Sequence, residues 1–223
     1  GIIGKGYVGG SLTNGFKGFF ETKVFDNDAK RSLDSFDTVI NTTDFIFVCV
    51  PTPMSIQNGG RVDPSIVEDV LAKISTNLNK GNNPLIIIKS SLPPGAVEKL
   101  IVKFSNLDIV FNPEFLTEKN ADKDFINATR VLIGGEKHLC EKLAALYRKR
   151  FKDKKIIQTD VTTAQYVKYM CNCFFSVKVS FMNEMFQAAQ ALGVNWKDAC
   201  EGFVSDGRVG LSHLDVPGHD GFY

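Results

Sequence analysis

The sequence predicts an α/β protein: a Rossmann-type, doubly wound parallel sheet followed by the start of an all-helical dimerisation domain. Short apolar runs alternate with helical patterns up to residue 160, as is typical of parallel sheets. A Gly-x-Gly-x-x-Gly segment, Gly4 to Gly9, follows the first run. From Thr162 to Leu192 the chain contains neither Gly nor Pro. We therefore expect two domains, residues 1–160 and residues 161–223.

The glycine segment opens the first expected βαβ unit, directly after a strand over residues 1–3. In such a segment the first glycine permits a tight turn, the second lets a pyrophosphate approach the backbone, and the third lets the helix pack closely on the sheet. The pyrophosphate then lies at the helix N-terminus. The segment alone would also suit a turn without a ligand. Its residues are Gly4, Lys5, Gly6, Tyr7, Val8 and Gly9.

Asp26 is the acidic partner that a dinucleotide-binding unit requires. It ends an expected strand over residues 23–26, about 20 residues after the glycines, where a carboxylate can accept both ribose hydroxyls. Asn27 and Asp28 stand beside it, so Asp26 could instead be an acid of a turn. The ribose interpretation predicts NAD rather than NADP, because a carboxylate repels a 2′-phosphate.

Further elements follow in the same alternation. Strands are expected at residues 45–50, 85–89, 108–111, 130–133 and 155–158. Asp63 and Pro64 indicate a helix start, with a capping acid before a proline at the first helical position. The segment from Lys89 to Gly95 predicts a tight loop at a strand's carboxyl end, which is the edge where open α/β sheets bind ligands.

The stretch over residues 162–192 predicts a helix about 45 Å long, too long for a crossover between neighbouring strands. Gly193 would end it, and Asn195 would cap the next helix. Two apolar stripes indicate burial on two sides, against the first domain and against a second subunit. We expect a homodimer through this helix. The first stripe is Tyr166, Met170, Phe174, Val177, Phe181, Met185 and Leu192; the second is Val167, Phe175, Met182, Phe186 and Ala189.

Composition narrows the function classes. Twenty-six basic and 25 acidic residues give a net charge of +1, which argues against a nucleic acid or a membrane surface as partner. No apolar run is long enough to span a membrane and no signal peptide is visible, so we expect a cytoplasmic protein. The five cysteines are irregularly spaced. They predict neither a disulfide nor a zinc site, but reduced thiols, mostly in the core, and no metal.

Two pairs of polar residues are candidates for catalysis. Lys168 and Asn172 share a helix face, and Lys168 is either a snorkelling surface residue or the polar lining of a cleft between domains. Asn112 and Pro113 predict a capped helix on which Glu114 and Glu118 share a face, where they could merely complement the helix dipole. Two carboxylates, a lysine and an amide near a nicotinamide would suit redox chemistry at a carbon bearing oxygen.

Together these motifs resemble the nucleotide-sugar 6-dehydrogenases, the family that includes UDP-glucose and GDP-mannose dehydrogenases. The resemblance covers essentially the whole chain and depends on the order and spacing of the set. The matching segments are Gly4 to Gly9, Val50-Pro51-Thr52-Pro53, Lys89-Ser90-Ser91, Asn112 to Glu118, Lys168 to Asn172, Asn183-Glu184 and Arg208-Val209-Gly210.

The resemblance implies a role for each matching residue. Lys168 and Asn172 would stabilise oxyanion character on the C6 oxygen of a nucleoside-diphosphate sugar, and Glu114 would handle protons. The substrate site would also include Phe115, Leu116, Arg208 (often reaching across a dimer) and His213, although His213 could be a plain surface histidine. NAD would be held by Gly4, Gly6, Tyr7, Val8, Gly9, Asp26, Arg31, Pro51, Thr52 and Ser91, with Glu118 at the nicotinamide end.

The resemblance also implies a mechanism, with UDP-glucose as the expected substrate. Two hydride transfers to NAD would take C6 through a cysteine thiohemiacetal to a thioester, which water hydrolyses to UDP-glucuronate. In the family the cysteine follows the equivalent of Val216-Pro217-Gly218. The chain ends at Tyr223, so we expect a fragment that lacks the nucleophile and is inactive alone.

Two departures and two alternatives accompany this prediction. Ser91 stands where threonine is usual, and Gln165 replaces a common glutamate one turn before Lys168, which leaves its role open. A β-hydroxyacid dehydrogenase of the 6-phosphogluconate type would share the Rossmann domain, the long helix and the lysine–asparagine pair. A non-catalytic NAD-binding or dimerisation module is the alternative from another class.

Overall fold

The chain forms two compact units in a computed structural model, which describes residues 1–55 and 59–216. The first unit comprises Gly1–Lys168 and the second Tyr169–Tyr223. The division falls inside the long helix α7 (Val161–Leu192), whereas the sequence analysis places the domain boundary at residue 160. The first turns of α7 therefore belong to the first unit.

A seven-stranded sheet organises the first unit, in the order β2-β1-β3-β6-β7-β8-β9. The chain moves from β1 to one side for β2 and to the other side for β3, so the strand order reverses at β1. This reversal is the place where doubly wound sheets bind ligands. The strands are β1 (Ile2–Ile3), β2 (Val24–Phe25), β3 (Phe45–Val48), β6 (Leu85–Ile88), β7 (Ile109–Phe111), β8 (Arg130–Gly134) and β9 (Lys155–Thr159).

One strand pair departs from the predicted parallel arrangement. Phe111 of β7 lies opposite Gly134 of β8 in an antiparallel pair, while the other neighbours are parallel. Between β7 and β8 lie only the short η2 (Glu118–Asn120) and α5 (Ala121–Asn127), and α5 packs on α1. The chain therefore re-enters the sheet from the carboxyl edge of β7. The predicted fold class, a mostly parallel α/β sheet, is confirmed.

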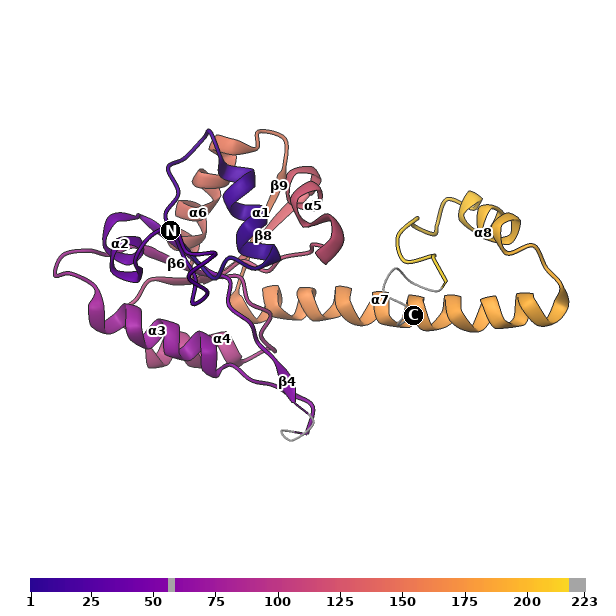
Figure 1. The fold of residues 1–223 in the computed structure, drawn as a ribbon, viewed down its shortest axis with the longest axis horizontal. Helices are drawn as coiled ribbons and strands as arrows, with labels where there is room; N and C mark the ends of the chain where they lie inside the picture. The colour runs from indigo at the N-terminus through magenta and orange to yellow at the C-terminus, as the bar shows by residue number, and fades with distance from the viewer. Residues whose placement is uncertain (56–58, 217–223) are drawn as a thin grey trace. The chain divides into compact units, whose positions relative to one another are not determined.

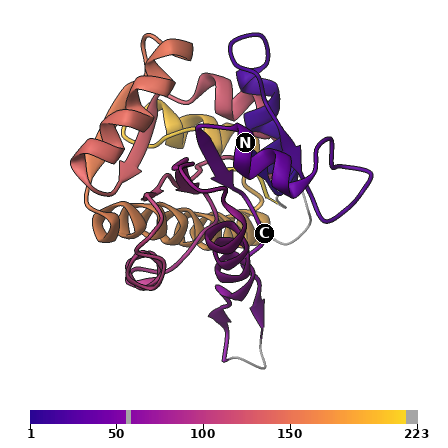
Figure 2. The ribbon, with the colours of Figure 1, turned by 90° about the vertical axis from the view of Figure 1, so that its left-hand side faces the viewer.

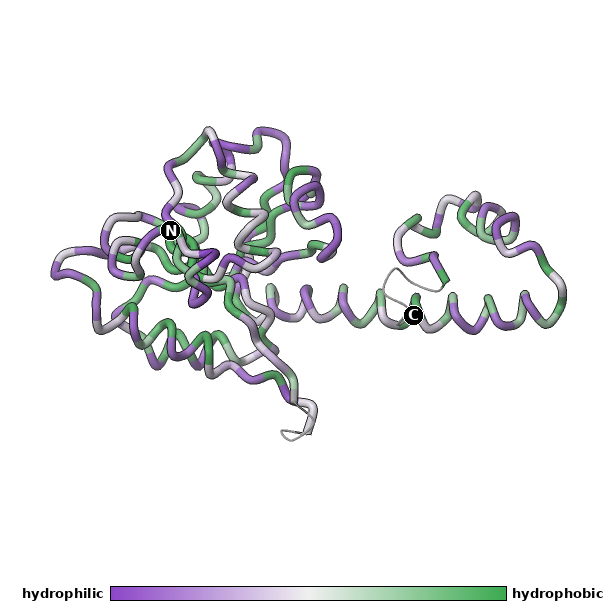
Figure 3. The backbone as a smooth tube through the Cα atoms, viewed as in Figure 1, coloured by the Kyte–Doolittle hydropathy of each residue, from purple (hydrophilic) through white to green (hydrophobic). Residues whose placement is uncertain are grey.

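Helices cover both faces of this sheet (Figures 1 and 2). Ile86 and Ile88 of β6 pack into one hydrophobic cluster, and Leu85 and Ile87 pack into the other, as the alternation of a strand requires. Figure 3 shows the hydrophobic segments gathered where the strands lie. One face carries α1 (Tyr7–Phe16), α5 and α6 (Lys137–Arg150); the other carries α2 (Phe36–Thr42), α3 (Ser65–Asn77) and α4 (Ala96–Lys103).

A small hairpin, absent from the sequence prediction, precedes α3. β4 (Met54–Ser55) and β5 (Arg61–Val62) pair antiparallel and extend away from the sheet (Figures 1 and 2). Two-residue strands are too short to show a period, so the sequence carries no signal for them. The predicted helix start is confirmed to within one residue: α3 begins at Ser65 and not at Pro64, and Asp63 accepts a hydrogen bond of 2.9 Å from the backbone N–H of Ser65.

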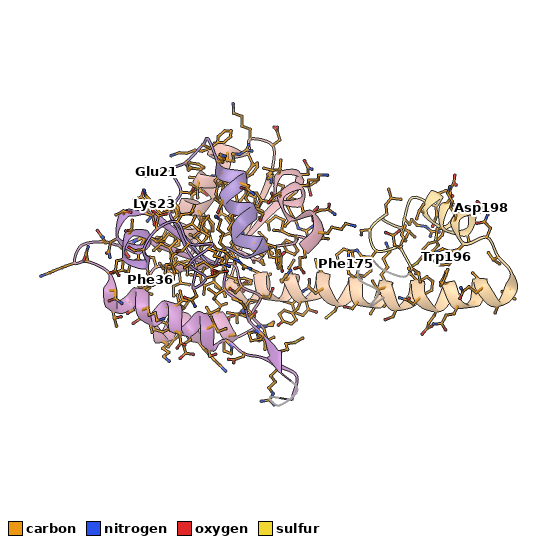
Figure 4. All side chains as sticks on the ribbon, viewed as in Figure 1. Glu21, Lys23, Phe36, Phe175, Trp196 and Asp198 are labelled. Atoms are coloured by element: carbon orange, nitrogen blue, oxygen red, sulfur yellow. The ribbon has the colours of Figure 1, made fainter. Side chains whose placement is uncertain are left out.

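The second unit contains the rest of α7, α8 (Trp196–Ser205) and the following loop. The long helix and its end are confirmed: Gly193 has a φ of +66°, and the side chain of Asn195 caps α8. The ring centres of Phe186 in α7 and Trp196 are 5.4 Å apart; Trp196 is labelled in Figure 4. The second predicted stripe includes the buried Met182 and Ala189. The members of the first stripe are between 42% and 78% exposed.

The five thiols are free, but the prediction that most lie in the core is wrong. Only Cys140 is buried; Cys173 is exposed, and the others are half-buried. On α7, Cys171 lies in line with the second stripe, between Val167 and Phe175, whereas Cys173 lies on another face of the helix and is exposed. Over residues 1–55 and 59–216, none of the helices has an apolar stretch that could span a lipid bilayer.

Candidate active site

A cavity of about 790 Å³ lies at the carboxyl edge of the first unit's sheet. The loops after β1, β2, β3, β6 and β7 all contribute to its lining, as expected for this fold. Helix α3 contributes Ile66, Val70 and Lys73, which the sequence analysis missed. Gly9 lies outside the lining, and Glu118 lines a neighbouring cavity that shares Tyr7. The predicted cofactor residues in the lining are Gly4, Gly6, Tyr7, Val8, Asp26, Arg31, Pro51, Thr52 and Ser91.

The three glycines of the segment meet three different requirements. Gly4 has a φ of +91°, and a Cβ there would lie 2.7 Å from the carbonyl oxygen of Cys49. A Cβ on Gly6 would meet nothing within 4 Å, whereas one on Gly9 would lie 1.9 Å from the carbonyl oxygen of Gly4. The segment therefore has the tight turn, the open approach and the close helix packing that suit a bound pyrophosphate.

Asp26 is both a turn acid and a cavity residue. Its Oδ2 accepts a hydrogen bond of 2.6 Å from the backbone N–H of Lys5, and its Oδ1 accepts one of 2.8 Å from that of Asp28. The two interpretations of Asp26 are therefore compatible, because a carboxylate oxygen can accept more than one hydrogen bond. Arg31 lies nearby, with its Nε 3.4 Å from the carboxylate of Asp28. Contact of Asp26 with a ribose stays a prediction.

Hydroxyl groups join the loops that follow β3 and β6. Thr52 Oγ1 donates to the carbonyl oxygen of Ser91 at 2.9 Å, and Ser90 Oγ donates to that of Val50 at 2.6 Å. These two loops form adjoining parts of the cavity wall. The Thr52 hydroxyl thus has a structural partner in addition to its predicted cofactor role.

Glu114 and Lys168 form a buried ion pair. Lys168 Nζ donates to Glu114 Oε1 at 2.8 Å, and the two side chains are 5% and 9% exposed. The other oxygen, Oε2, accepts from the backbone N–H of Leu116 at 2.6 Å. The burial of Lys168 shows that the snorkelling interpretation is wrong, and the alternative, the polar lining of a cleft between domains, stays a prediction.

The predicted helix start at Asn112 and Pro113 is wrong. Residues 112–117 are irregular, and the first helical residue after them is Glu118. The Asn112 side chain cannot cap a helix because it makes other buried hydrogen bonds. Glu114 is held by Lys168 and a backbone amide, so the helix-dipole interpretation of this carboxylate also fails.

The ring of Phe115 lies close to two cations, Lys168 and Arg130. Lys168 Nζ is 5.4 Å and the Arg130 guanidinium carbon 4.7 Å from the centre of its ring, distances at which cations attract aromatic rings.

Burial and the carboxylates of Glu114 and Glu118 raise the pKa of Tyr7 above its ordinary value. The predicted substrate contacts of Phe115 and Leu116 stay predictions.

A buried polar network behind the pair escaped the sequence analysis. Lys89 Nζ donates to the carbonyl oxygen of Asn112 at 2.9 Å and to its Oδ1 at 3.1 Å, and Tyr147 donates to the same Oδ1 at 2.7 Å. Burial lowers the pKa of Lys89 to about 8 and raises that of Cys49 to about 12. The sequence feature that could have indicated this network is Lys89 itself, a lysine directly after the apolar run Leu85–Ile88.

Gln165 has a definite structural role, which the sequence analysis left open. Its side chain is fully buried. Its Nε2 donates to the carbonyl oxygens of Pro93 at 2.6 Å and Leu92 at 3.3 Å, and its Oε1 accepts from the backbone N–H of Gly95 at 3.3 Å. The amide joins the first turns of α7 to the loop after β6.

Three predicted site residues belong to the second unit. Asn172 is exposed on α7, one turn beyond Lys168. Arg208 pairs with Asp206 at 2.8 Å. His213 is exposed, with a φ of +61°, and one face of its ring stacks on Phe175 with ring centres 4.2 Å apart.

The His213 loop is also held through backbone carbonyls. Lys178 Nζ donates to those of Gly210 and Ser212, at 2.6 and 2.5 Å. Burial and the charge of Lys178 lower the pKa of His213. Pro217 and Gly218, named in the resemblance, lie outside the described residues. The substrate roles of Asn172, Arg208 and His213 stay predictions.

Comparison with known proteins accords with this geometry. The profile of the UDP-glucose/GDP-mannose dehydrogenase family, NAD binding domain, matches residues 20–151, and that of the family's central domain matches residues 162–220. The first match alone spans more than half of the chain. This chain belongs to the UDP-glucose/GDP-mannose dehydrogenase family. The resemblance and the predicted cofactor, NAD, are thereby confirmed.

Individual relatives agree with the family. The UDP-glucose 6-dehydrogenase of Rickettsia conorii is 30% identical over 204 residues, which cover 89% of this chain and 46% of the relative. The GDP-mannose dehydrogenase structure from Pseudomonas aeruginosa superposes with a TM-score of 0.81 at 26% identity, over 96% of this chain and 58% of that one. The chain thus spans about half the length of the curated relatives that it matches.

A more distant likeness shows the fold alone. The 3-hydroxyisobutyrate dehydrogenase of Mycobacterium tuberculosis superposes with a TM-score of 0.71 at 15% identity, over 92% of this chain and 69% of that one. This chain therefore shares its fold with that dehydrogenase, and a shared fold does not imply a shared reaction.

Proposed function

We propose that this chain is the NAD-binding part and the beginning of the central part of a nucleoside-diphosphate-sugar 6-dehydrogenase that oxidises UDP-glucose to UDP-glucuronate. The observation that carries the proposal is the buried pair of Glu114 and Lys168 beside a cavity built for a dinucleotide. A carboxylate and an ammonium group held together out of water suit proton transfer and stabilisation of negative charge on oxygen.

The chain's own residues then have separate tasks. The N–H groups after Gly6 and the open space beside it would receive the pyrophosphate, and Asp26 the ribose. Bound NAD supplies the acceptor for each hydride. Lys168 and Asn172 would stabilise developing negative charge on the C6 oxygen, and Glu114 would accept the proton of the attacking water during thioester hydrolysis.

The proposed reaction needs one nucleophile beyond Tyr223. The C6 alcohol loses a hydride and a proton, and a cysteine thiol adds to the resulting aldehyde. The thiohemiacetal loses a second hydride and proton to become a thioester, and water then releases the carboxylate and the thiol. A covalent intermediate allows both oxidations without release of the aldehyde.

The shared architecture makes a β-hydroxyacid dehydrogenase the second candidate. That reaction also uses a lysine and an asparagine one turn apart on the long helix, but it requires neither a buried Glu114 nor a cysteine. It would consume one NAD per substrate and yield a ketone or an aldehyde.

We also propose that two copies of the chain associate through the exposed stripe of α7. Met170, Phe174 and Val177 are each more than half exposed, and such a stripe on one helix suits an isologous contact. Light scattering should give a dimer for the wild type and a monomer for Phe174→Glu. A monomeric wild type would exclude this contact.

Turnover by an extended protein tests the catalytic proposal. A chain that continues past Tyr223 to the expected cysteine should form two NADH per UDP-glucose, while residues 1–223 alone should form none. Glu114→Gln in the extended protein should give a rapid burst of NADH and a mass increase from the trapped thioester. Lys168→Ala should lower the rate by roughly 10² or more with little change in NAD affinity.

Three results would contradict this assignment. One NADH per sugar would favour the hydroxyacid candidate. An extended protein that binds NAD but oxidises no sugar would favour a non-catalytic module. Normal steady-state turnover of both variants would mean that Glu114 and Lys168 are structural.

A further inference from the structure

Three buried polar side chains from three elements meet at the candidate site, and one of them, Lys89, lines its cavity. Lys89 follows β6, Asn112 follows β7, and Tyr147 lies in α6. They are 4%, 2% and 2% exposed. Asn112 Oδ1 accepts from both Lys89 Nζ and the Tyr147 hydroxyl, and the Asn112 amide donates to the carbonyl oxygen of Leu132 at 2.7 Å. The side chain of Asn112 is therefore held from three directions.

The presence of Lys89 at this position is costly for the fold. Its ammonium group is bonded to neutral oxygens of Asn112 and not to a carboxylate. Burying a cation without such a partner is unfavourable, and an apolar side chain of similar length would avoid the penalty. A buried charge of this kind beside a cavity points to a role in the site.

The network leads directly to Glu114. Asn112 is two residues before it, and Lys89 also binds the Asn112 backbone carbonyl. Glu114 itself accepts hydrogen bonds from Lys168 Nζ and from the backbone N–H of Leu116. The segment over residues 112–117 forms no helix or strand, so internal hydrogen bonds of a regular element cannot hold it in place.

We propose that Lys89 is a positioning residue that, with Tyr147, holds Asn112 and thereby fixes the carboxylate of Glu114 opposite Lys168. The importance of this for catalysis rests on the proposed function of Glu114, but the positioning itself does not. Lys89 has no contact with the reacting atoms in this account; it acts through Asn112.

Amide hydrogen exchange of residues 1–223 tests the positioning without a substrate. The reporter is the N–H of Leu116, whose acceptor is Glu114 Oε2. In Lys89→Met we expect this amide to exchange roughly tenfold faster or more, while the amides of β6 keep their wild-type rates. The matched control is Lys99→Met, which removes an exposed lysine of α4 and should leave Leu116 unchanged.

Two results would overturn the proposal. One is an unchanged Leu116 amide in folded Lys89→Met. The other is faster exchange by one common factor throughout β6, β8 and residues 112–118, because a lysine that only stabilises the fold would act on all of them together.

A second variant decides the matter if Lys89→Met does not fold. Tyr147→Phe removes one hydroxyl donor to Asn112 and keeps the packing of the ring, so it should also speed exchange at Leu116. Tyr166→Phe, at a Tyr side chain that is 62% exposed, is its control. Equal Leu116 rates in these two variants would refute the network as a positioning device. Faster Leu116 exchange with normal NADH formation by the extended protein would instead count against the proposed function of Glu114.

Discussion

Lys168 Nζ lies 2.8 Å from Oε1 of Glu114 although 54 residues separate the two in the chain. The contact joins the first turns of α7 to the loop after β7. Because both side chains are buried, neither charge can recover its lost hydration if the other is removed. The pair is therefore sensitive to single substitutions in a way that exposed ion pairs are not.

The first prediction concerns the stability of this pair. Lys168→Met should lower the free energy of unfolding by about 3 to 5 kcal/mol, because it leaves the Glu114 carboxylate buried and unpaired. Adding Glu114→Gln should restore part of the loss, since it removes that charge. Urea unfolding of the two variants measures the difference. Lys103→Met, which breaks the exposed pair with Glu68, is the control and should cost much less; a similar cost would contradict the buried-pair account.

The second prediction separates binding from folding within the glycine segment. Gly6→Ala should fold normally, because its Cβ would meet nothing within 4 Å, yet bind NAD more weakly by occupying the approach of the pyrophosphate. Gly9→Ala should be unstable, because its Cβ would lie 1.9 Å from the Gly4 carbonyl oxygen. Thermal unfolding and NAD titration distinguish these effects. Gly10→Ala, whose Cβ is also unobstructed, should leave NAD affinity unchanged and should not lower stability, because alanine favours a helix more than glycine does. Wild-type NAD affinity in Gly6→Ala would show that no pyrophosphate lies there.

The third prediction concerns the choice of dinucleotide. The wild-type chain should bind NAD more tightly than NADP, because the carboxylate of Asp26 would repel a 2′-phosphate. Asp26→Asn should reduce that preference, whereas Asp28→Asn should preserve it, since Asp28 is absent from the cavity lining. Fluorescence titrations with both dinucleotides give the ratio. If the wild type bound NADP as tightly as NAD, Asp26 would be a turn residue only.

The fourth prediction is a pH dependence of stability. Burial lowers the pKa of Lys89 from 10.5 to about 8, so between these values the unfolded chain binds more protons and stability rises with pH. Relative to Lys89→Met, the wild type should gain about 1 kcal/mol of unfolding free energy between about pH 7 and about pH 9.

Urea unfolding at the two pH values measures this gain, with Lys99→Met as the control that should follow the wild type. The pKa of Cys49, raised by burial, lowers stability at higher pH. It is present in all three proteins, so comparing them isolates Lys89. Parallel pH profiles for Lys89→Met and the wild type would mean that the pKa of Lys89 is not lowered in the folded chain.

Local patterns in the sequence were sufficient for most of the fold. The glycine segment, the apolar runs that became strands, and the stretch without Gly or Pro each encode their structure within a few neighbouring residues. The antiparallel entry of β8 is different. It depends on where the chain between Phe111 and Arg130 packs, and that is a tertiary property that no short window contains.

In the site, too, local features could be predicted from the sequence and tertiary contacts could not. Lys168 and Glu114 could be named as candidates because each lies in a recognisable motif. Their contact, and the hydrogen bonds from Lys89 and Tyr147 to Asn112, join residues far apart in sequence, so no spacing rule predicts them. The helix expected at Asn112 was wrong for the same reason: its capping oxygen is used by two distant donors, and tertiary contacts overrode a local signal.

Gln165 makes one attachment of α7 independent of acidity. A carboxylate in its place could accept from the Gly95 amide, but it would have to carry a proton to face the carbonyl oxygens of Leu92 and Pro93 favourably. The carboxamide supplies donor and acceptor together and does not titrate. One turn further on, the attachment of Lys168 to Glu114 depends on two ionised groups. The helix is therefore joined to the loop after β6 by a neutral amide and to the loop after β7 by a pair of opposite charges.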